Sequence, residues 1–219
     1  MSSQFNATSD FLHSVISLDT LISFAESEES KGNSDNRSLF LRLGIVTLVT
    51  KFQVFIERIL EEFLFELNNS NILNKELPVH FRINNFKIFF AQKNIQKELE
   101  NPTTYNINKL SNIQILLSEL NTLIEDDLHS KNNNLNTKYP LGKTGLQELR
   151  DLFLQIEGVD IFSNAPFDIN RINEILGRRH AIIHEDKDMQ LTELKLIEYK
   201  DFIKSVVQYI DNYLTEKLI

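Results

Sequence analysis

The chain lacks cysteine and tryptophan, and its 219 residues include only six glycines and four prolines. The absence of cysteine excludes disulfide bonds, thiolate metal sites and thiol nucleophiles, and it is compatible with a reducing cytoplasm. A length of about 200 residues is enough to bury a hydrophobic core within one domain. The function must therefore rest on other side chains.

Positive charge and long hydrophobic runs are also scarce. The formal net charge is −8, which excludes a protein that coats nucleic acid nonspecifically but leaves room for a small basic site. The apolar stretch near Leu43 is bounded by Arg42 and interrupted by Lys51, so it falls short of the roughly 20 residues of a membrane span. The first residues lack the basic and apolar regions of a secretory signal. We expect a soluble, cytoplasmic protein without membrane contact.

The apolar residues recur at intervals of three and four, which predicts an all-α fold in a single domain over residues 1–219. The first helix should begin after Ser9, as its N-cap, and end near Phe24, because a polar run over residues 26–38 follows. The further helices are expected at residues 38–67, 78–100, 108–128, 144–156, 168–186 and 191–218. Asp168 is expected to cap the helix at 168–186. The helix at 38–67 is apolar on nearly every side, which is typical of the central helix of a bundle.

A long polar connection over residues 130–145 separates two of these helices. Its asparagine-rich part, residues 132–136, is expected to be a flexible, solvated linker, with a substrate or partner contact as the alternative.

Two arginines and two histidines gather in the stretch GRRHAIIHED, residues 177–186. His180 and His184 are four residues apart and share one face of a helix, so they could chelate a metal ion. The stretch lacks the glutamate of the HExxH zinc motif, and no third ligand has a suggestive spacing. We therefore expect neither a metal nor another cofactor.

Arg179 projects near the centre of the apolar stripe of its helix, which Ile172, Ile175, Leu176, Ile182 and Ile183 help to form. A guanidinium in such a stripe is costly unless it is paired or lines a site that needs its charge. One interpretation is a buried ion pair with Glu57 or Glu61 of the long helix. The other is a phosphodiester site, in which Arg179 stabilises the phosphorane and His184 moves a proton near neutral pH.

The string from Arg179 to His184 resembles the R-x4-6-H motif of the HEPN superfamily, with His180 at the polar position after the arginine. With a helix before it and one long helix after it, the string is similar to the HEPN domains of the RiboL-PSP group and its near relatives. The resemblance is most specific between about residue 142 and residue 209, and the motif-bearing core would cover about 142–219.

This resemblance implies an antiparallel helical bundle that homodimerises and brings two motifs into one cleft. Catalytic members of the superfamily are metal-independent endoribonucleases, which implies RNA as the substrate. By this analogy His184 is the general acid or base for attack by the ribose 2′-hydroxyl, Arg179 stabilises the pentavalent phosphorus and His180 orients the phosphate. Arg178 contacts the RNA backbone or is simply solvated.

The leading hypothesis is a HEPN ribonuclease that acts as a toxin or a defence-system effector, with an antitoxin or a defence protein as a further partner. The second is a catalytically silent HEPN module that dimerises and binds RNA, a nucleotide or a partner protein. The third is a helical interaction protein in which the motif is only a packed ion pair.

Overall fold

The computed structural model describes residues 5–93, 107–140, 145–185 and 190–218, and it confirms the all-α prediction. Within these residues there is no strand, and the only β pairing is an isolated bridge between Leu73 and His129. The helices are α1 (Asn6–Ser14), α2 (Ser17–Ser30), α3 (Ser34–Asn69), α4 (Val79–Lys93), α6 (Ile107–Ile124), α7 (Gly145–Glu157), α8 (Asn170–Glu185) and α9 (Glu193–Glu216), with a short 3-10 turn at Asn74–Glu76.

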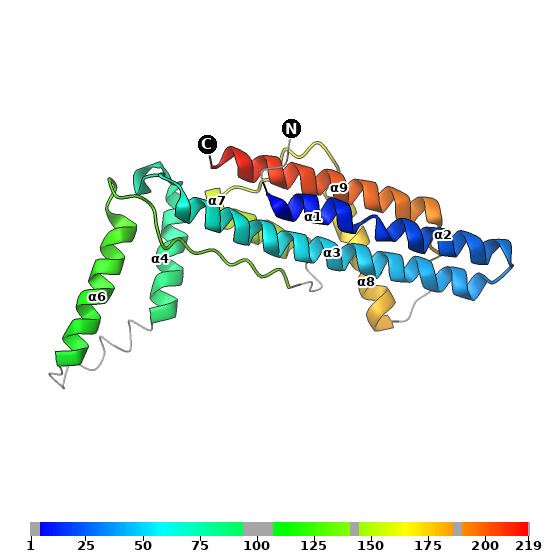
Figure 1. The fold of residues 1–219 in the computed structure, drawn as a ribbon, viewed down its shortest axis with the longest axis horizontal. Coiled ribbons are helices and arrows are strands. Elements are labelled where there is room, and N and C mark those ends of the chain that lie inside the picture. The colour runs from blue at the N-terminus through cyan, green and yellow to red at the C-terminus, as the bar shows by residue number, and fades with distance from the viewer. Residues whose placement is uncertain (1–4, 94–106, 141–144, 186–189, 219) are drawn as a thin grey trace.

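Helix α3 is the central helix, as its all-round apolar sequence predicts. Helices α1, α2, α8 and α9 all pack against it (Figure 1). In the described part of the chain, α3 is the one helix long and apolar enough to span a membrane by length and composition alone. Twelve of its residues, from Leu41 to Leu67, are buried inside the protein, so α3 serves here as a core helix.

The prediction for the N-terminal region is wrong in its boundaries. Two helices replace the single expected one, and Ser9 lies inside α1, where its hydroxyl donates to the carbonyl of Asn6 instead of capping the helix. Helix α2 continues to Ser30, well into the polar run, because the polar side chains of its last turns face solvent while Ala25 stays buried. The chain leaves the helical conformation at residues 31–33, where Gly32 has a φ of 75°.

The turn between α2 and α3 is held by one carboxylate. Glu28 accepts hydrogen bonds from Lys31, Asn33 and Asn36, at 2.6, 2.9 and 3.0 Å. These bonds, the one from Lys31 first, lower the pKa of Glu28 to about 2. The polar run at residues 26–38 was expected to separate two helices by a long break, but it forms only a short turn between α2 and α3.

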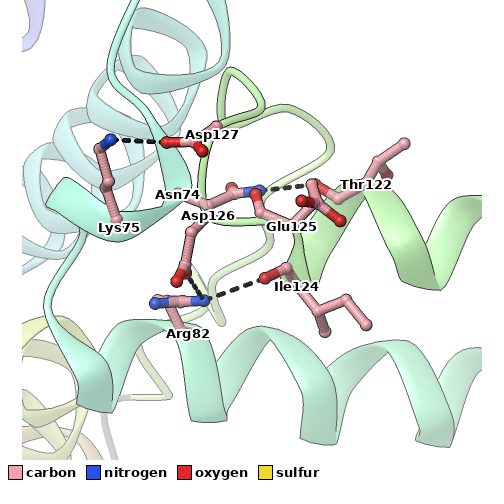
Figure 2. A network of polar contacts seen from close by, with 8 residues as sticks. All are labelled: Asn74, Lys75, Arg82, Thr122, Ile124, Glu125, Asp126 and Asp127. Carbon is pink, nitrogen blue, oxygen red and sulfur yellow. Dashed lines mark hydrogen bonds and ion pairs between the residues drawn. The ribbon is translucent and has the colours of Figure 1, made fainter.

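Helices α4 and α6 form an arm that projects from one end of the bundle (Figure 1). A polar network fastens its base (Figure 2): the side-chain amide of Asn74 donates to the carbonyls of Thr122 and Glu125, each at 2.8 Å. Ion pairs Lys75–Asp127 and Arg82–Asp126, at 2.6 and 2.7 Å, lie on either side of it. The two helices predicted at 78–100 and 108–128 are thus present, although α6 ends at Ile124 and part of the first range lies outside the described residues.

The asparagine-rich segment is anchored to the bundle, and the expectation of a flexible linker is wrong. Asn133 is 3% exposed, and its side-chain amide nitrogen donates to the side-chain oxygen of Asn68 on α3 at 3.0 Å. Its side-chain oxygen accepts from the side-chain amide of Asn85 on α4 at 2.8 Å. Buried amides satisfy one another here, so the composition that suggested solvation instead builds a polar junction between α3, α4 and the segment.

Replacing Asn133 by alanine is expected to destabilise the protein by about 1–3 kcal/mol, because the amides of Asn68 and Asn85 would lose a partner. Urea unfolding measures the change in the free energy of unfolding. Lys131→Ala, on an exposed side chain two residues away, is the matched control and should change it by less than about 0.5 kcal/mol. Equal stability of the Asn133→Ala variant and the wild type would contradict an anchoring role.

Candidate functional site

The first half of α8 is set firmly into the bundle. The carboxylate of Asp168 accepts the backbone N–H of Asn170 at 3.0 Å, which confirms its predicted capping role. Ile172, Ile175 and Leu176 are buried, and the helix packs on α3 and α7. The approach to α7 is close: a Cβ added to Gly145 would lie 2.6 Å from a methyl group of Leu176. The start of α8 is therefore a fixed base for the residues that follow.

The second half of α8 leaves the core and projects past α3 (Figure 1). Leu176 is the last fully buried residue of the predicted stripe: Ile182 still packs against the core but is only partly buried, and Ile183 is 44% exposed. Periodicity alone cannot show where a neighbouring helix stops, and here the apolar pattern outlasts the packing. The motif thus lies on a helix end that solvent, or a second molecule, can reach.

Arg179 does not form the ion pair that was one of the two interpretations of its position. Glu57 accepts the backbone N–H of Tyr139 at 3.1 Å, and Lys138 lies 3.5 Å from Glu57 and 3.9 Å from Glu61. Arg179 itself is half-buried, and its Nε is shielded from solvent without a hydrogen-bond acceptor among the described residues. No described carboxylate neutralises this guanidinium, so its charge remains available to an anion.

The two histidines of the motif lie together. The ring centroids of His180 and His184 are 4.6 Å apart with the planes tilted by 44°, and His184 is the more exposed of the two. In the described ranges, no three histidine, aspartate or glutamate side chains are grouped so that they could hold a metal ion. An imidazole can act as a general base when it is neutral and as a general acid when it is protonated.

Arg178 points toward α9. Its Nε lies 3.4 Å from Glu174, one turn earlier, and its guanidinium carbon lies 5.7 Å from the ring centroid of Tyr199. The side chain is 23% exposed, so it is not simply solvated, which was one of the two alternatives for it. Arg179, His180 and His184 thus lie together in the second half of α8. Arg178 lies instead beside Glu174 and Tyr199.

The sequence did not predict the cluster around Tyr199. Buried Tyr199 donates its hydroxyl hydrogen bond to Glu174, and Arg171 and Lys195 lie 5.8 and 5.1 Å from its ring centroid. The hydrogen bond from Tyr199, more than the nearby cations, lowers the pKa of Glu174, while burial is the main reason that the pKa of Tyr199 is raised. The spacing of Glu174 and Arg178 could have revealed their pairing. Nothing local pointed to Tyr199, which comes from the next helix.

Replacing Tyr199 by phenylalanine is expected to raise the pKa of Glu174 toward its ordinary value of 4.5, because the largest cause of the lowering is removed. A carboxyl group with a lowered pKa stabilises the fold above its unfolded pKa and loses that contribution as the pH falls. The free energy of unfolding of the variant should therefore fall less steeply below about pH 4.5 than that of the wild type. Carbon NMR of the carboxyl group, titrated with pH, measures the shift directly.

Tyr209→Phe is the control for this titration, because the Tyr209 hydroxyl donates to the carbonyl of Ile161 and not to a carboxylate. It should leave the pKa of Glu174 unchanged. An unchanged pKa in Tyr199→Phe would show that the hydrogen bond does not govern Glu174.

A family model described as RiboL-PSP-HEPN matches residues 9–216, which is nearly the whole sequence. No curated protein and no solved structure matches this chain.

Proposed function

This chain belongs to the RiboL-PSP-HEPN family, and we propose that it is a metal-independent endoribonuclease that acts as a homodimer. The observation that carries the proposal is the state of Arg179: a half-buried guanidinium, without a described carboxylate partner, lies two helical turns or less from two adjacent imidazoles. A fixed cation beside groups that exchange protons near neutral pH suits the cleavage of a phosphodiester.

In the proposed reaction the ribose 2′-hydroxyl attacks the neighbouring phosphorus while His184 takes its proton. Arg179 stabilises the charge on the pentavalent phosphorus, and His180 orients the phosphate or His184. The bond to the 5′ oxygen then breaks, and the protonated His184 gives its proton to the leaving oxygen, so the products are a 2′,3′-cyclic phosphate and a 5′-hydroxyl. The proposed reaction needs no metal ion, because Arg179 supplies the charge stabilisation and His184 the proton transfer that a metal could otherwise provide.

Geometry on the helix supports a second copy at the site. Arg179 and His184 are five residues apart, about 140° around α8, so one helix does not aim both side chains at one atom. A twofold axis would let two motifs converge on a single phosphate. The exposed Ile183, directly before His184 in the sequence, gives such a contact an apolar element. The paired motifs would also concentrate positive charge on an otherwise acidic protein.

In the cell, we propose, the protein is a cytoplasmic toxin or defence effector that a partner protein restrains or activates. Support for this part comes from the family membership alone.

The test is cleavage of total cellular RNA by the purified protein in EDTA, with analysis of the product ends. Cyclic-phosphate ends are expected, and an oligonucleotide with a 2′-deoxyribose at the cleaved position should stay intact. Cleavage that requires a divalent cation, or products with 5′-phosphate ends, would overturn the proposed mechanism. RNA binding without cleavage would identify the protein as a silent binding module.

A further inference from the structure

A cavity of about 350 Å³ lies between α1 and α3 and is open to solvent on one side. Five residues of each helix line it, and none comes from α8. The size is at the lower end of the range for small-molecule sites, about 300–1,000 Å³. The cavity is therefore a separate feature from the motif and could hold a small organic molecule.

One end of the cavity carries positive charge. The ammonium group of Lys51 is on a half-buried side chain and forms no ion pair with a described residue. The residues one turn away on α3, at positions 47, 48, 54 and 55, are uncharged, so no neighbouring carboxylate on the helix offsets this charge. His13, in the last turn of α1, lines the same cavity. At the other end, Arg58 is paired with Asp10 at 2.8 Å and contributes little net charge.

Four of the ten residues that line the cavity are apolar, and of these only Val54 is substantially exposed. The rings of Phe11 and Phe55 lie in contact, with centroids 5.6 Å apart and planes tilted by 56°, and Val54 beside them is 49% exposed. Val54 is exposed on the central helix, next to the partly buried Lys51, which has no described counter-ion. A ligand with an apolar body and an anionic group would cover the valine and pair with the lysine.

We infer that this cavity binds a small organic anion, with its acidic group at Lys51 and its apolar ring against the exposed side chain of Val54. The inference is independent of the ribonuclease proposal, because it uses no residue of α8 and its test measures binding alone. Charge complementarity decides the sign of the ligand, since the cavity is locally cationic on a protein of net charge −8.

Isothermal titration calorimetry with the full chain tests it by comparing three probes: naphthalene-1-sulfonate, the neutral naphthalene-1-methanol and sulfate alone. The sulfonate should bind saturably with one site per chain and at least tenfold more tightly than either of the other two, because only it meets both the charge and the walls. Equal affinity for the neutral ring, or the absence of saturable binding, would overturn the inference.

A matched pair of variants locates the site. Lys51→Met, which keeps the apolar stem and removes the charge, should weaken sulfonate binding at least tenfold. Lys131→Met, at an exposed side chain that does not line the cavity, should leave it unchanged. Circular dichroism confirms that each variant is folded. A loss of the same size in both variants would mean that the sulfonate responds only to overall charge and would contradict a site at Lys51.

Discussion

His184→Ala is expected to reduce the rate of RNA cleavage by about 10²–10⁴-fold, the usual contribution of a positioned general acid or base. The loss should appear in the cleavage rate at saturating RNA more than in RNA binding, because the imidazole moves a proton and does not anchor the strand. Single-turnover cleavage of a labelled RNA in EDTA, with binding measured separately, distinguishes the two effects.

The fold should survive this substitution, because His184 is exposed at the end of α8. The midpoint of thermal unfolding is the check. His129→Ala is the matched control, since that histidine is also exposed and makes a hydrogen bond only to the carbonyl of Asn71. Full activity in His184→Ala would remove the histidine from the mechanism, and an unfolded variant would assign it a structural role instead.

Phe52→Ala is expected to destabilise the protein by about 3–5 kcal/mol, the largest stability effect among these predictions. Phe52 is fully buried on α3 and packs on the ring of Phe55 and the edge of Tyr139, each with centroids 6.3 Å apart. Truncation removes this apolar contact and leaves a cavity that helices on several sides of α3 cannot easily close. Chemical unfolding, followed by circular dichroism, measures the loss.

Val54→Ala is the control on the same helix. Its side chain is about half exposed, so the change should stay within about 0.5 kcal/mol. If Phe52→Ala cost no more than this control, α3 would not be the centre of the core. The pair separates the cost of a core cavity from the general cost of altering α3.

The sequence determined those features of the protein that arise within one helix. A helix is made by hydrogen bonds and side-chain spacing over a few residues. Periodicity therefore predicted α3, α7, α8 and α9 to within about four residues at each end, and Asp168 was recognisable as the cap of α8. The same locality placed Arg179, His180 and His184 on one helix, and it made the family recognisable before any packing was known.

The tertiary structure alone decided what each of these side chains meets. Packing between helices and loops brings Tyr199 to Glu174 and buries Asn133 between Asn68 and Asn85. It also engages Glu57 with Tyr139 instead of Arg179. Local spacing carries no information on these encounters, because they depend on how far one helix extends past another and where each loop returns. For that reason the sequence could name the residues of the motif, while only the packing of α8 on α3 showed that its end projects from the core and that Arg179 has no described carboxylate partner.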